Sequence, residues 1–242
     1  MIAFILQPLF AFFYANTNTK VFAEDVLGKS SEEISIDNGK FNSSSSASLQ
    51  TSPYGWTKIE SDSTLKAGVI TVADQKTFEN NSESYGLSNN ENPSKFGGDV
   101  NDNKVLMINS ENATTNFGFK SSPITLTPNS FYVFNIKMKT MNESVGSIYL
   151  SGLSEKYTVA NSFIAEPSHN WANGQFYIFV KTGIETKTTN IELWLGSKDS
   201  VKSSGAVFFD NIDLFKTSDK TFTDLKKSTT LKREFNLSGE TN

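Results

Sequence analysis

The chain has no cysteine and a single histidine among its 242 residues. Without cysteine it has no disulfide framework and no thiolate metal or redox site. The one histidine, His169, lies in a polar stretch with no nucleophile motif beside it, and phosphate-binding and dinucleotide-binding patterns are absent. The net charge of −4, without a basic stripe, argues against nucleic acid as a partner. These absences predict a chain that is not an enzyme.

Long apolar runs are also scarce, apart from the first 14 residues, which carry no charge. This run is shorter than the ~20 residues of a spanning helix but suits the apolar core of a signal peptide. Val21 and Ala23 suit cleavage after Ala23. No Lys or Arg precedes the run, so retention as an anchor is the alternative. We expect residues 1–23 to be a signal peptide or membrane anchor, the only membrane contact of a secreted or cell-surface protein.

Uncharged polar residues and phenylalanine are abundant instead: the sequence holds 32 Ser, 23 Thr, 24 Asn and 20 Phe. Apolar residues alternate with polar ones in short segments, most clearly over 131–139, where Tyr132, Phe134, Ile136 and Met138 share one face. By the same criterion, with clusters of Gly, Pro, Asn and Asp as boundaries, we expect strands at residues 65–72, 105–109, 117–120, 124–126, 131–139, 147–153, 175–181, 190–195 and 206–214.

About nine or ten short strands without a strong amphipathic helix predict an all-β sandwich of two antiparallel sheets. We expect this sandwich to be a monomeric domain over residues 34–216. Residues 24–33 are polar and are expected to be a linker. Residues 217–242 are expected to be a tail or linker, with a short helix around 223–235 as the alternative.

Five segments resemble, in the same order, motifs of one family. They are Asn38-Gly39-Lys40-Phe41-Asn42, Tyr54-Gly55-Trp56, the segment 124–140, the segment 171–180 that starts at Trp171, and Gly205 to Ile212. Together they resemble the jelly-roll carbohydrate-binding modules attached to bacterial xylanases and glucanases, which have the galactose-binding-like sandwich. The resemblance implies a jelly roll from about residue 34 to 216. It does not by itself imply sugar binding, because one fold hosts many functions.

The same resemblance implies one structural calcium ion between the first and last strands. Asp210 matches the family's closing aspartate, whereas Asn42 stands where the family has a glutamate. Asp37 lies close enough in sequence to compensate, and calcium prefers such oxygen ligands. The expected metal residues are therefore Asp210, Asn42 and Asp37, and the alternative is that Asp210 only caps or salt-bridges a strand end.

Sugar binding needs exposed aromatic rings with polar groups beside them. If the aliphatic residues of the expected strands face the core, Trp194, Tyr149, Tyr177 and Phe179 face outward, together with Glu192 and Lys137. We expect these six residues to line one concave sheet surface, since exposed aromatic groups often mark a binding site. In the alternative, long loops cover the sheet and bury the same rings. Trp56 and Trp171 are expected to be structural anchors.

The sequence thus predicts an exported, non-catalytic β-sandwich that binds carbohydrate of a cell surface or extracellular glycan. Two alternatives stay open: a structural or adhesive surface module without a sugar ligand, and an appended domain of a larger glycoside hydrolase.

Overall fold

The computed structural model describes residues 27, 30–42, 49, 52–59, 65–71, 83, 85–87, 104–111, 117–141, 144–153, 162–165, 175–196, 203–229 and 232–238. The expected signal or anchor segment 1–23, His169 and Trp171 lie outside these residues. In the part of the chain that is described, no helix is both long and apolar enough to span a bilayer.

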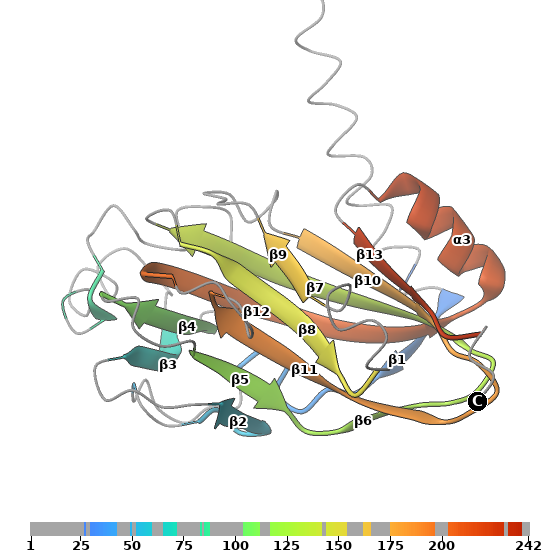
Figure 1. The fold of residues 1–242 in the computed structure, drawn as a ribbon, viewed down its shortest axis with the longest axis horizontal. Helices are drawn as coiled ribbons and strands as arrows, with labels where there is room; N and C mark the ends of the chain where they lie inside the picture. The colour runs from blue at the N-terminus through green and yellow to red at the C-terminus, as the bar shows by residue number, and fades with distance from the viewer. Residues whose placement is uncertain are drawn as a thin grey trace, which may run out of the picture.

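The described residues form two sheets, which Figure 1 shows as stacked layers. The first sheet has the order β13-β10-β7-β12-β4-β3, with β1 also paired to β12. Its strands are β1 (Glu32–Ile34), β3 (Lys66–Thr71), β4 (Lys104–Ser110), β7 (Phe131–Met141), β10 (Gln175–Lys181), β12 (Gly205–Thr217) and β13 (Lys232–Asn236).

The second sheet has the order β2-β5-β11-β8-β9, with β6 also paired to β11. Its strands are β2 (Trp56–Ile59), β5 (Phe117–Ser121), β6 (Ile124–Leu126), β8 (Gly146–Ser151), β9 (Ser162–Ala165) and β11 (Lys187–Leu195). All described pairings are antiparallel except that of β13 with β10. The predicted fold class, an all-β sandwich of two sheets, is confirmed.

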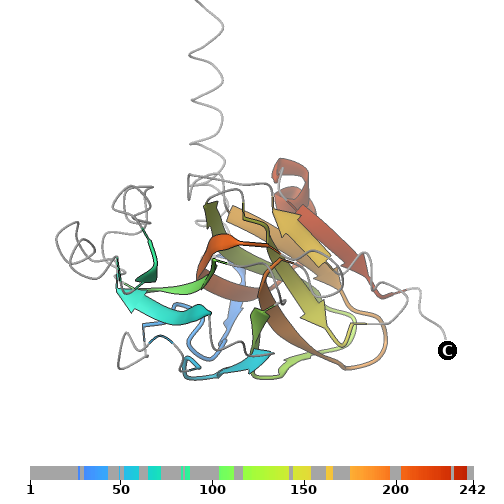
Figure 2. The same ribbon diagram turned by 60° about the vertical axis from the view of Figure 1, so that its left-hand side comes forward.

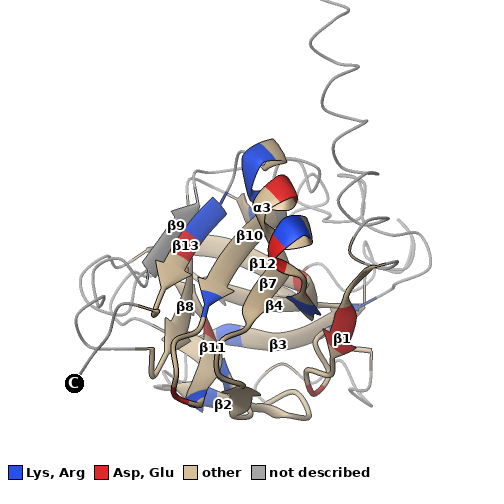
Figure 3. Ribbon diagram, turned by 90° about the vertical axis from the view of Figure 1, so that its right-hand side faces the viewer, with Lys and Arg blue, Asp and Glu red and all other residues tan. Residues whose placement is uncertain are grey.

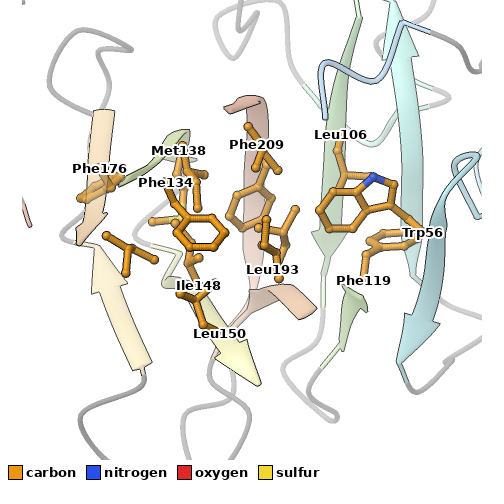
Figure 4. Close-up of a cluster of buried hydrophobic side chains, with 14 of the residues drawn as sticks. Trp56, Leu106, Phe119, Phe134, Met138, Ile148, Leu150, Phe176, Leu193 and Phe209 are labelled. Carbon is orange, nitrogen blue, oxygen red and sulfur yellow. The ribbon is translucent and has the colours of Figure 1, made fainter. Parts of the chain in front are cut away.

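The main core lies between the two sheets (Figure 4). Alternate residues of β7, from Tyr132 to Met138, point into it and are at most 1% exposed. Leu193 of β11 and Ile148 of β8 meet them from the opposite sheet. The period-two pattern read from the sequence is therefore the pattern of burial, because successive side chains of a strand point to opposite faces.

A second layer covers one end of the outer face of the seven-stranded sheet. Helix α3 (Asp219–Ser228) begins at the cap Ser218, whose hydroxyl oxygen accepts a hydrogen bond from the backbone N–H of Thr221. Its Phe222 and Leu225 pack with Phe179 and Leu27 in one buried cluster. Figures 1 and 2 both place α3 beside β13 at this side of the sandwich.

The C-terminal segment corrects the prediction of a tail or linker from residue 217. Strand β13 pairs with β10 from Tyr177↔Lys232 to Lys181↔Asn236. Its Phe235 and the following Leu237 are buried in the main core. Residues 219–229 and 232–237 thus belong to the folded unit. At the other end, Leu27 is buried and Glu32–Ile34 form β1, so the expected linker 24–33 also contributes to the fold.

Candidate functional site

The six predicted ligand-binding residues lie on two different sheets. Trp194 and Glu192 lie on β11 and Tyr149 on β8, in the six-stranded sheet, whereas Tyr177, Phe179 and Lys137 lie on β10 and β7 of the other sheet. Each group faces away from the main core, because its neighbours in sequence fill that core. The expectation of one shared concave surface is therefore wrong. Alternation in a sequence predicts the face of a strand but not its sheet.

The three residues of the six-stranded sheet form a buried group. Trp194 is 2% exposed, Glu192 3% and Tyr149 4%. The indole Nε1–H of Trp194 donates to Oε2 of Glu192 at 3.3 Å, and the ring of Tyr149 meets Trp194 edge to face at 6.5 Å. Lys120 lies 4.0 Å from the same carboxylate. The expectation that these rings are exposed is therefore wrong, because they are buried. A buried indole needs a hydrogen-bond partner for its N–H, and Glu192 supplies it.

Tyr177 and Phe179 are also buried, because α3 covers their face of the sheet. The ring of Phe222 meets Phe179 edge to face at 5.2 Å. Lys137 is half-buried and lies opposite Asp210 in the register of β7 with β12. None of the four predicted rings is exposed, so a role of these residues in ligand binding stays a prediction without an accessible surface.

The structure does show a hollow of about 430 Å³ beside β1, which we call the β1 hollow. Its polar lining consists of Glu33, Ser35, Asn38, Lys40, Asn42 and Asp213. Figure 3 shows the acidic residues of β1 at this edge of the sheet. Carboxylate, amide, hydroxyl and ammonium groups therefore converge on one concave place.

Backbone geometry brings the two sides of the hollow together. A bulge between Asp210 and Asp213 interrupts the pairing of β12 with β7, and Asn211 has a positive φ of 46° there. The N–H of Ile212, inside this bulge, donates to the carbonyl oxygen of Gly39 at 3.0 Å. A Cβ at Gly39 would lie 2.4 Å from the carbonyl oxygen of Ile212, so only glycine permits this approach.

Asp213, in the lining of the hollow, has a carboxyl group with a raised pKa. Burial raises the pKa of its carboxyl group, and Glu33 raises it further. Lys40 and Lys137 act in the opposite direction, as does a hydrogen bond with the side chain of Asn135. Asp213 thus tends toward the neutral, protonated form at a higher pH than an ordinary aspartate.

Tyr54 stands next to the hollow and is 69% exposed, which makes it a large hydrophobic residue in contact with solvent. Its carbonyl oxygen accepts a hydrogen bond from Nδ2 of Asn38 at 3.2 Å. Gly55, with φ of 79°, packs so closely that a Cβ there would lie 2.5 Å from Cβ of Asp37. The backbone of Tyr54 is thus held next to Asn38 of the polar lining, and its aromatic side chain is open to solvent.

The predicted metal residues differ in their surroundings. Asp210 is 4% exposed, and its Oδ1 accepts the N–H of Asn211 at 2.7 Å. Asn42 and Asp37 are exposed. The described residues contain no group of three or more acidic or histidine side chains placed to hold a metal ion. Calcium binding itself stays a prediction.

Sequence reasoning found both backbone segments of the hollow but not the hollow. The segments 38–42 and 205–212 were read for their likeness to a family and for metal ligands. Lys40 and Tyr54 stand in segments that resemble the family's motifs, but neither they nor Glu33 and Asp213 were predicted as site residues. Their meeting depends on β1 pairing with the end of β12, as in Ile34↔Leu214.

No family model matches the chain, and no curated protein does. Solved structures do resemble it. The enzymatically active domain of tailspike protein 4 of bacteriophage CBA120 has a TM-score of 0.45 and 11% identity over 75% of this chain, which spans only 21% of that domain.

Two others are carbohydrate-binding modules. A CBM4 module has a TM-score of 0.44 and 13% identity, with coverage of 76% of this chain and 100% of the module. TmCBM61, solved in complex with β-1,4-galactotriose, has a TM-score of 0.41 and 12% identity, with coverage of 75% and 99%. β-Sandwich carbohydrate-binding modules, the group that the sequence motifs resemble, are thus among the structures similar to this fold.

Proposed function

We propose that this chain is an exported, non-catalytic module that binds carbohydrate at the β1 hollow, with the ring of Tyr54 as a stacking surface. The observation that carries the proposal is the exposed Tyr54, whose backbone carbonyl oxygen is hydrogen-bonded to Asn38 of the hollow's polar lining. A sugar presents hydroxyl groups to hydrogen-bonding side chains and an apolar ring face to an aromatic side chain. The uncharged N-terminal run supports export.

The ligand that fits is a short or terminal piece of a glycan. A concave site with a few convergent polar groups is the usual form of a small-ligand site. Asn38 and Asn42 supply amide groups, Ser35 a hydroxyl group, and Glu33 and Asp213 carboxyl groups. These groups hold and orient hydroxyls without any chemical step.

The proposal is tested with the chain from Glu24 onward on a glycan array, followed by calorimetric titration of any sugar that binds. We expect Tyr54→Ala to weaken binding by about fivefold or more, since an aromatic contact contributes on the order of 1 kcal/mol or more. The melting temperature should stay unchanged, because the side chain is exposed.

Ile184→Ala is the matched control. Ile184 is 76% exposed and is not part of the hollow's lining, so its loss should leave affinity unchanged. Equal binding by Tyr54→Ala and the wild type would refute the site. Cleavage of a bound oligosaccharide would contradict the non-catalytic part of the proposal.

A structural or adhesive surface module is the second candidate. The burial of Trp194, Tyr149, Tyr177 and Phe179 favours it, because these rings act as packing groups. A correctly folded chain that binds no sugar on the array would support this candidate and reject the first.

A further inference from the structure

The loop of residues 36–42 contacts both sheets. The carbonyl oxygen of Gly39 accepts a hydrogen bond from the N–H of Ile212 of β12 in the seven-stranded sheet, as described above. The buried ring of Phe41 packs on Trp56 of β2 in the six-stranded sheet, with ring centroids 5.5 Å apart. The indole N–H of Trp56 donates to the carbonyl oxygen of Asp37 at 3.1 Å. The loop thus joins the two layers at one end of the sandwich.

A lysine forms a further contact with this loop. Lys104 is the first residue of β4, where the register Thr71↔Lys104 fixes its backbone in the sheet. Its Nζ donates to the carbonyl oxygen of Asn42 at 3.2 Å. A positive charge therefore lies at the end of the loop, against the backbone of a predicted calcium ligand.

The predicted calcium ligands do not belong to a group of acidic or histidine side chains that could hold a metal ion, among the residues that the structure describes. One carboxylate oxygen of Asp210 accepts a backbone N–H, and the carbonyl oxygens of Asp37 and Asn42 accept hydrogen bonds from Trp56 and Lys104. Calcium needs six to eight oxygen ligands, several of them charged. The glutamate expected from the resemblance is the neutral and exposed Asn42.

We propose that the Lys104 ammonium group, and not a metal ion, ties the 36–42 loop to the seven-stranded sheet through the carbonyl oxygen of Asn42. An ammonium group carries three donors on a flexible stem and hydrogen-bonds carbonyl oxygens more strongly than a neutral donor does. The hydrogen bond that holds the loop is therefore made by the chain itself and needs no ion. The proposal does not depend on sugar binding.

Thermal unfolding of the full chain tests the proposal. The wild type should melt at the same temperature in a chelator and in millimolar calcium, because nothing that binds only the folded state is being removed. Lys104→Met keeps the length and apolar stem of the side chain but removes the charge. We expect it to melt about 2–4 °C lower in both solutions.

Lys227→Met is the control, because Lys227 is exposed on α3 and the same replacement there should leave the melting temperature within about 1 °C of the wild type. Calcium raising the wild-type melting temperature, or heat of binding in a calcium titration, would overturn the proposal. A Lys104→Met chain that melts like the wild type would overturn it as well.

Discussion

Lys139 on β7 is a fully buried lysine, with an exposed fraction of 0%. It lies opposite Phe208 in the register of β7 with β12, and Phe208 belongs to a buried apolar cluster with Met141. Burial lowers the pKa of Lys139 from 10.5 to about 7. The alternation over residues 131–139 places Lys139 on the face opposite to Tyr132 and Phe134, which is correct, but it could not predict that this face is covered.

This lysine should make stability depend on pH in the neutral to alkaline range. From about pH 7 up to its ordinary pKa of 10.5, the unfolded chain holds a proton on Lys139 that the folded chain loses. Stability conferred by this site therefore rises with pH in that range and is constant below it. We expect Lys139→Met to be more stable than the wild type at neutral pH, by about 1–3 kcal/mol.

Urea unfolding at several pH values checks this prediction. The advantage of Lys139→Met should be largest near pH 7 and shrink toward alkaline pH, whereas the exposed Lys227→Met should show no such trend. A constant difference between Lys139→Met and the wild type across this range would show that Lys139 does not change its protonation on unfolding.

At the scale of single elements, the strands with strong alternation were predicted well. Strand β6 has the expected bounds, and β10 as well, while β7 and β12 extend further than expected. Strands β1 and β13 were missed because each is short and polar: β13 reads KREFN with one buried residue, Phe235. The extended conformation of β13 depends on its pairing with β10, and its own sequence pattern does not predict it.

The pairing of β13 gives a direct test of whether the C-terminal segment is part of the fold. Phe235 is 2% exposed, whereas Arg233 on the same strand is exposed. We expect Phe235→Ala to cost about 3 kcal/mol and to lower the melting temperature by roughly 6–12 °C. Arg233→Ala should change it by no more than about 2 °C. If both variants melted together with the wild type, the segment would behave as the linker first predicted.

At the scale of the molecule, the chain passes repeatedly between the two sheets. Strands β5 and β6 belong to one sheet, β7 to the other, β8 and β9 again to the first, and the crossing continues to β12. Neither sheet is a contiguous piece of sequence, so neither can fold alone. The sequence predicted two sheets and a shared core, but the assignment of strands to sheets needed the long-range pairings.

This connectivity predicts a single cooperative unfolding transition. In calorimetry the measured enthalpy should equal the van't Hoff enthalpy, and tryptophan fluorescence and circular dichroism should give the same midpoint. Two resolved transitions, or midpoints that differ between the probes, would contradict the view that α3 and β13 unfold together with the sandwich.

The position of Trp56 makes its intrinsic fluorescence sensitive to the candidate site. Its indole is 4% exposed, and its N–H is bonded to Asp37, which directly precedes Asn38 in the wall of the β1 hollow. A molecule that enters the hollow and shifts this loop changes the electric field at the indole and so the wavelength at which it emits. Trp56 is therefore an intrinsic fluorophore next to the candidate site, and comparison with a chain that lacks Trp56 would separate its signal from that of the other two tryptophans.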